Sequence, residues 1–106
     1  MKKEDPIKEA VEKGKAEKKP TIVEFTGPWC SSCFAQDDII ESVQGTLNDV
    51  IVAKIDVEEH PEAAGKHDII SLPALLIFDL DGRLVLRSTG KVVEIEEIIS
   101  YISLEK

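Results

Sequence analysis

Apolar residues recur at helical spacing in four segments of the chain. Near the amino end they stand at positions i, i+3, i+4 and i+7 among lysines and glutamates, which predicts an amphipathic helix over residues 6–18. Pro6 suits the first turn of this helix, and Pro20 ends it by pushing Lys19 towards extended backbone. The other helices are expected over about residues 31–47, 58–67 and 92–102.

Apolar stripes predict which sides of two of these helices are buried. The buried side of the second helix is expected to consist of Phe34, Ile40, Val43 and Leu47. In the last helix one stripe comprises Val92, Ile95, Ile99 and Ile102, with Ile98 beside it. Each stripe predicts a helix that covers one face of a sheet.

Four runs rich in β-branched and other apolar residues predict strands. They cover residues 21–26, 50–56, 74–78 and 84–86. The first run is interrupted by one acidic residue, Glu24. A helix separates the first two strands, which favours parallel pairing between them. Asp81-Gly82, between the last two strands, predicts a hairpin turn.

The expected order of elements is helix, strand, helix, strand, helix, strand, strand, helix. This order predicts a single α/β domain over residues 1–106, in which helices cover both faces of a four-stranded mixed sheet. Residues 1–5 precede the first helix, and we expect them to be flexible.

Composition narrows the classes of function. The chain has 106 residues, 42% of them hydrophobic, and a net charge of −8. An acidic protein repels nucleic-acid phosphates and anionic lipid, so we expect neither nucleic-acid nor membrane binding. No apolar run approaches the roughly 18 residues of a membrane span, and no apolar segment follows the basic residues at the amino end. We therefore expect a cytoplasmic protein, although a signal peptide removed from a precursor would leave the same sequence.

The two cysteines, Cys30 and Cys33, stand at the predicted junction between a strand and a helix. Two cysteines are too few to staple a secreted scaffold, and a C-x-x-C bridge closes too short a loop to stabilise the fold much. At the amino end of a helix, free backbone amides and the helix dipole favour a thiolate over a thiol. The pattern predicts that Cys30 is the uncovered, attacking nucleophile. Cys33, one turn further in, would be shielded and would resolve the mixed disulfide.

Other interpretations of this segment remain open at the level of sequence. An inert buried cysteine pair would show the same spacing. A zinc site would need two further ligands, for which the chain offers His60 and His67, but nothing in the sequence places either histidine near the cysteines. Trp29, directly before the pair, could be a packing residue.

Residues 23–33, which read Val-Glu-Phe-Thr-Gly-Pro-Trp-Cys-Ser-Ser-Cys, resemble the active-site segment of the thioredoxin family. The similarity covers about residues 20–104 and continues through residues 52–56, residues 71–74, the Asp81-Gly82 turn and Gly90. The resemblance implies a thioredoxin-like three-layer α/β/α fold. We expect this fold to lack the family's first strand, because the given sequence begins with a predicted helix.

The same resemblance implies a substrate groove beside the cysteines. Pro73 corresponds to the family's cis-proline, and the backbone of Leu72 would hydrogen-bond an extended substrate segment. Trp29 and the turn at Gly90 would lie around the same groove.

Two charged residues have roles that the resemblance implies. Glu24 stands at the position of the family's buried acid, and Lys54 at that of its basic partner. A buried carboxylate near Cys33 would have a raised pKa and would accept the proton of that thiol. Glu24 is one methylene longer than the usual aspartate, and Ser31-Ser32 replaces the Gly-Pro of thioredoxin. Without the resemblance, Glu24 could be an acid tolerated in a strand and Lys54 an exposed edge residue.

The function implied is that of a protein-disulfide oxidoreductase, which exchanges its Cys30–Cys33 dithiol with disulfides in protein substrates in the reducing direction. Such an enzyme uses its own redox-active disulfide and needs neither a metal nor an organic cofactor. It would be a monomer and would draw electrons from a thioredoxin-reductase-like partner. Two alternatives stay open: a redox-switched adaptor that docks one dedicated partner, and a disulfide oxidase or isomerase.

Overall fold

The computed structural model describes residues 5–47 and 49–102, in which helices and strands follow one another in the order expected from the sequence. The strands are β1 (Thr21–Thr26), β2 (Ile51–Asp56), β3 (Ala74–Phe78) and β4 (Leu84–Thr89). The helices are α1 (Pro6–Glu17), α2 (Cys33–Thr46), α3 (Pro61–Lys66) and α4 (Ile95–Ile102). Of the segment expected to be flexible, residues 1–4 lie outside the described residues, and Asp5 caps α1.

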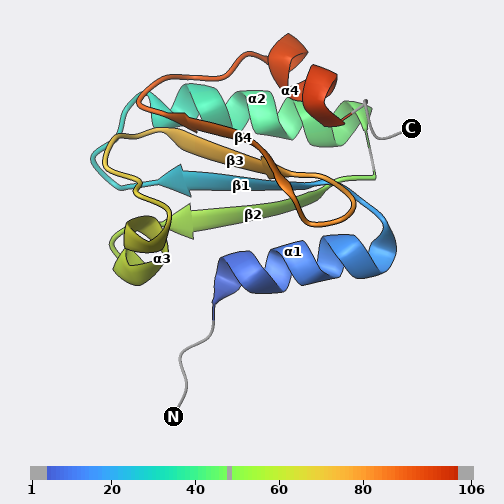
Figure 1. The fold of residues 1–106 in the computed structure, drawn as a ribbon. Helices are drawn as coiled ribbons and strands as arrows, with labels where there is room; N and C mark the ends of the chain where they lie inside the picture. The colour runs from blue at the N-terminus through green and yellow to red at the C-terminus, as the bar shows by residue number, and fades with distance from the viewer. Residues whose placement is uncertain (1–4, 48, 103–106) are drawn as a thin grey trace.

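The strands form one mixed sheet in the order β2-β1-β3-β4. β1 is parallel to β2 and antiparallel to β3, and β3 is antiparallel to β4. Figure 1 shows α2 and α4 on one side of this sheet and α1 and α3 on the other. The α/β fold with a four-stranded mixed sheet and helices on both faces is therefore confirmed.

Each face of the sheet has its own hydrophobic core, because successive residues of a strand point to opposite faces. On β1, Val23 and Phe25 belong to the core that includes residues of α1 and α3. Ile22 belongs to the core that includes residues of α2 and α4. Glu24 is two residues from Ile22 and therefore faces α2. Its neighbour in register on β2 is Lys54.

The hairpin turn between β3 and β4 forms as predicted. The Asp79 carboxylate accepts hydrogen bonds from the backbone N–H groups of Asp81 and Arg83, each at 2.9 Å. Gly82 has a φ of 83°, in the left-handed region that glycine adopts without strain.

The buried side of α2 differs from the expectation at Phe34. This side chain was expected in the core, but it is 70% exposed, so that prediction is wrong. Gln36 takes a buried place instead, because its side-chain amide donates to the Val93 carbonyl at 3.1 Å and accepts from the Val93 N–H at 2.8 Å. This pair of hydrogen bonds satisfies a polar group that would otherwise be costly to bury.

The buried side of α4 consists of other residues than the predicted stripe. Ile98, expected beside the stripe, is buried together with Ile102, whereas Val92, Ile95 and Ile99 are only partly buried. The helix begins at Ile95, so Val92 lies before it and does not share its helical phase.

Candidate active site around the disulfide

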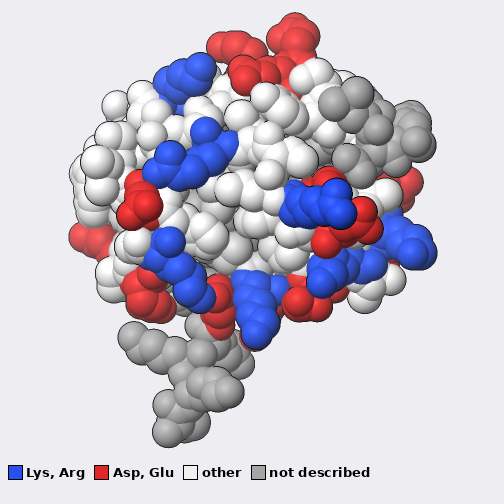
Figure 2. All heavy atoms as spheres, viewed as in Figure 1, with Lys and Arg blue, Asp and Glu red and all other residues white. Residues whose placement is uncertain are grey.

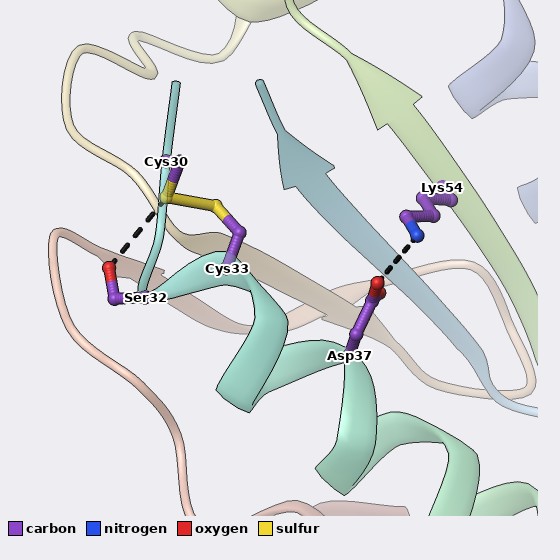
Figure 3. The surroundings of a disulfide bond; sticks show 5 residues. All are labelled: Cys30, Ser32, Cys33, Asp37 and Lys54. Carbon is purple, nitrogen blue, oxygen red and sulfur yellow. Dashed lines mark hydrogen bonds and ion pairs between the residues drawn. A yellow bond between two sulfur atoms is a disulfide. The ribbon is translucent and has the colours of Figure 1, made fainter. Parts of the chain in front are cut away.

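Cys30 and Cys33 form a disulfide where the chain passes from β1 into α2 (Figure 3). Cys33 is the first residue of α2, and its backbone N–H donates to the Cys30 carbonyl at 3.3 Å. The Cα atoms of the two cysteines are 5.4 Å apart. The sulfurs therefore lie at the amino end of a helix of 14 residues, where the helix dipole favours a thiolate once the bond is reduced.

The two cysteines differ in exposure in the expected order. Cys30 keeps 9% of its surface exposed, against 3% for Cys33. The value for Cys30 is small, which corrects the expectation of an uncovered residue in the disulfide form. The Ser32 hydroxyl lies 3.7 Å from the Cys30 sulfur, within reach of a sulfur hydrogen bond.

An open groove of about 370 Å³ lies on one side of the disulfide. Trp29, 65% exposed, and Ile70, 92% exposed, present apolar surface beside it. The lining residues are Trp29, Cys30, Ser31, Ser32, Val57, Ile69, Ile70 and Leu72. Two residues expected around this groove, Trp29 and Leu72, thus lie together with Cys30.

Pro73 and Gly90, which were also expected at this groove, are not among its lining residues. The Leu72–Pro73 peptide bond is cis, as the resemblance implied. The Gly90 N–H donates to the Pro73 carbonyl at 2.9 Å. Gly90 has a φ of 78°, and a Cβ there would approach the Ser71 Cβ to 3.1 Å, so this turn favours glycine.

A second cleft, of about 270 Å³, lies against the disulfide on the side of β2. Its lining residues are Thr26, Gly27, Pro28, Cys30, Cys33, Phe34, Asp37, Lys54 and Asp56. Cys30 lines both clefts, whereas Cys33 lines only this one. The less exposed sulfur therefore faces a space lined by charged side chains.

Glu24 lies in register with Lys54, a lining residue of this second cleft, and has 1% of its surface exposed. Its Oε2 is buried and has no hydrogen-bond partner among the described residues. Burial raises the pKa of Glu24 to about 8, and the neighbouring Asp37 carboxyl group adds to the rise. Lys54 opposes the rise through its positive charge, and Glu41 adds slightly to it. Glu24 is therefore mostly protonated at neutral pH in the oxidised protein.

Asp37 joins Glu24 to Lys54. The Lys54 Nζ donates to the Asp37 Oδ2 at 2.7 Å, an ion pair between β2 and α2 that Figure 3 shows beside the disulfide. Burial alone would raise the pKa of Asp37, but the neighbouring Glu24 carboxyl and the hydrogen bond from Lys54 outweigh it and lower that pKa. The hydrogen bond to Asp37 raises the pKa of Lys54. Glu24 and Lys54, predicted as a pair, are thus linked through a third residue.

Among the residues of this site, Asp37 and Ile70 were not singled out from the sequence, and Phe34 was expected in the core and not at a cleft. Asp37 follows Cys33 by four residues, which places both on one side of a helix and was a usable signal. Ile70 and Phe34 carried no such signal, because an exposed apolar side chain resembles a core residue in sequence.

The described residues contain no group of three or more histidine, cysteine or acidic side chains placed to hold a metal ion. Among the helices of residues 5–47 and 49–102, none is long and apolar enough to cross a membrane.

Comparison with known proteins identifies the family. The family model described as Thioredoxin matches residues 2–103. The chain belongs to the thioredoxin family. Among curated thioredoxins, it is 41% identical over 73 residues to the chloroplastic thioredoxin Y2 of Arabidopsis thaliana, a match that covers 68% of this chain and 43% of that protein. It is 36% identical over 70 residues to the thioredoxin of Bacillus subtilis, covering 65% of this chain and 66% of the relative. Both matches span less than two thirds of the relative's length.

Solved thioredoxin structures share the fold at lower identity. The thioredoxin of Trichomonas vaginalis superposes with a TM-score of 0.77 at 22% identity, covering 98% of this chain and 95% of that one. The thioredoxin of Fasciola hepatica superposes with a TM-score of 0.76 at 24% identity, covering 94% and 91%. The thioredoxin fold expected from the sequence is thereby confirmed.

Proposed function

We propose that this chain is a thiol–disulfide oxidoreductase that reduces disulfides in protein substrates with its Cys30–Cys33 dithiol. The observation that carries the proposal is the disulfide itself, which lies at the amino end of α2 and at the edge of an open groove. Membership of the thioredoxin family supports the same activity. The enzyme uses no metal or organic cofactor, acts as a monomer in the cytoplasm, and receives electrons from a thioredoxin-reductase-like donor.

The reaction follows from the order of exposure of the two sulfurs. The Cys30 thiolate attacks one sulfur of a substrate disulfide, forms a mixed disulfide and releases the other substrate sulfur as a thiolate, which takes a proton from water. Cys33 then loses its proton to the Glu24 carboxylate and attacks the Cys30 sulfur. The second substrate sulfur leaves as a thiolate and takes a proton from water, and the Cys30–Cys33 disulfide of this structure is the product. Two electrons pass from the dithiol to the substrate, whose two sulfurs take their protons from water.

The groove provides the place for the substrate. Its lining residues include the apolar residues Trp29, Ile70 and Leu72. Such walls suit an extended segment with apolar residues next to its cysteine.

Trapping of mixed disulfides tests the two cysteine roles. We expect the Cys33→Ser variant to accumulate covalent complexes with a protein disulfide substrate such as insulin, because Cys30 attacks but nothing resolves the product. The Cys30→Ser variant should form few of them. Equal trapping by both variants would reverse the roles, and no reduction of insulin by the wild-type protein with any reductant would refute the activity.

A redox titration of the Cys30–Cys33 couple tests the direction of the reaction. For a reductant we expect a reduction potential near that of thioredoxin, about −270 mV. A strong disulfide oxidant has a potential of about −120 mV. A value close to the second figure would favour disulfide oxidation.

A further inference from the structure

The second cleft holds a charged residue that the proposed reaction does not yet use. Glu24 itself lines neither cleft and is almost completely buried. Asp37 lines the cleft, and it is ion-paired to Lys54, the neighbour of Glu24 in register, so it lies on the side of the buried carboxyl that faces the cleft. We propose that Asp37 is a positioning residue for the thiol–disulfide exchange: it shares the proton of Glu24 and connects that buried carboxyl to the cleft beside Cys33.

The position of Asp37 is set by two elements. It follows Cys33 by one turn of α2, so the two side chains lie on the same side of the helix and line the same cleft. Lys54 reaches across from β2 and holds the Asp37 carboxylate at 2.7 Å (Figure 3). Lys54 also lies in register with Glu24 in the sheet. The carboxylate of Asp37 is therefore anchored at a fixed place next to the buried acid.

The charges of Asp37 and Lys54 determine the effect of Asp37 on the protonation of Glu24. A carboxylate that accepts a hydrogen bond from a second carboxyl stabilises the protonated form of its neighbour, because two ionised carboxylates in contact repel each other. Lys54 keeps Asp37 ionised, so the shared proton resides on Glu24. The remaining charged groups near the pair are Glu41 on α2 and Asp56 on β2. Asp37 thus sets the pH at which Glu24 becomes the carboxylate that accepts the Cys33 proton.

The proton of Cys33 leaves the protein in two steps. Cys33 passes its proton to Glu24 during resolution, and Glu24 releases it to water by way of the Asp37 carboxylate. Asp37 returns to its ionised form, so it is neither consumed nor covalently changed. This role rests on the proposed oxidoreductase function.

The test compares Asp37→Asn with Asp38→Asn. Asp38 is the next residue on α2, is exposed and lines neither cleft, so it provides the same loss of charge away from Glu24. The first measurement is the titration midpoint of the Glu24 carboxyl by carbon NMR in the oxidised protein, where the cysteines do not titrate. The second is the pH dependence of insulin reduction.

We expect Asp37→Asn to lower the Glu24 midpoint by roughly one pH unit and to shift the activity profile to lower pH by a similar amount. Asp38→Asn should leave both within a few tenths. A Glu24 midpoint that is the same in the two variants would refute the shared proton. A shifted midpoint with an unshifted activity profile would refute the positioning role. If the wild-type protein reduces no disulfide, the proposed function fails, but the NMR titration still decides whether Asp37 and Glu24 share a proton.

Discussion

At the scale of single residues, the site combines a disulfide with one buried acid. Burial of Glu24 favours its neutral form, because an ionised carboxylate loses solvation inside the protein. The ion pair between Lys54 and Asp37 lies next to it and stays partly exposed. The same carboxyl that is proposed to serve the reaction therefore makes the folded protein sensitive to pH.

The free energy of unfolding should decrease as the pH rises, because Glu24 titrates at a higher pH in the folded protein than in the unfolded chain. Its pKa is raised from an ordinary 4.5 to about 8, so between these values the folded chain binds more protons than the unfolded chain. The free energy of unfolding of the oxidised protein should therefore decrease from about pH 5 to pH 8, by at most about 1.4 kcal/mol per pH unit. Denaturant unfolding at several pH values measures this.

The Glu24→Gln variant is the control for this prediction, since its amide does not titrate. Its stability should be nearly constant over the same range. Asp37 has a lowered pKa and Lys54 a raised one, so both titrate outside this window. A wild-type protein as insensitive to pH as Glu24→Gln would contradict the prediction.

Ile70 should contribute to substrate binding without stabilising the fold. It is 92% exposed and lines the groove beside Cys30. Burying such a side chain against a substrate is worth at most roughly 1.5–3 kcal/mol. We expect Ile70→Ser to raise the KM for insulin by up to about tenfold, with little change in kcat or Tm.

Leu84→Ser is the matched control, because Leu84 is also an exposed large apolar residue but lines neither cleft. It should leave the KM unchanged. Equal effects of the two variants would show that Ile70 acts only through general surface hydrophobicity.

At the scale of elements, the start of α1 is fixed by one side chain that serves two purposes. The Asp5 carboxylate accepts hydrogen bonds at 3.1 Å from the N–H groups of Ile7 and Lys8, which caps the helix. It also accepts a hydrogen bond from the Lys66 Nζ at 2.8 Å, which ties α1 to the end of α3. The Lys66 hydrogen bond is the main reason that the pKa of Asp5 is lowered.

Removing this cap should destabilise the protein. We expect Asp5→Ala to lower the free energy of unfolding by about 1 kcal/mol, measured by denaturant unfolding. Asp5→Asn keeps the cap and loses the ion pair, which is exposed and should cost roughly 0.5 kcal/mol or less. If Asp5→Asn were as destabilising as Asp5→Ala, the ion pair rather than the cap would fix the helix.

At the scale of the whole molecule, charge is distributed over the surface but is not balanced. The net charge is −8, although Figure 2 shows basic and acidic side chains interspersed on the face it presents. A molecule with this charge attracts cationic partners over distances of about a Debye length.

Substrate charge should therefore change the rate of reduction. Two disulfide peptides with the same apolar residues around the cysteines, one basic and one acidic, provide the test. We expect kcat/KM to be several-fold higher for the basic peptide at low salt, and the ratio to approach one near 1 M salt, where screening is strong. A ratio that does not change with salt would mean that contacts in the groove, not long-range charge, distinguish the peptides.

Much of the fold could be predicted from local sequence. β1 and β3 begin and end where their apolar runs do, and the turn at Asp81-Gly82 forms as its residues predict. The cysteine pair was found in the same way, because four consecutive residues and a helix start define it. The cis bond at Pro73 required the family resemblance, since a short sequence pattern does not distinguish the two isomers.

The sequence by itself determined the elements, their order and the cysteine pair at the start of a helix, because each depends on residues close together in the chain. Only the tertiary structure decided the partner of Glu24, since Asp37 reaches it from α2 and Lys54 reaches Asp37 from β2. It also decided that Phe34 is exposed, because the side of α2 that is buried depends on how the helix lies on the sheet. Contacts between elements are set by packing in three dimensions, which periodicity along the chain does not specify.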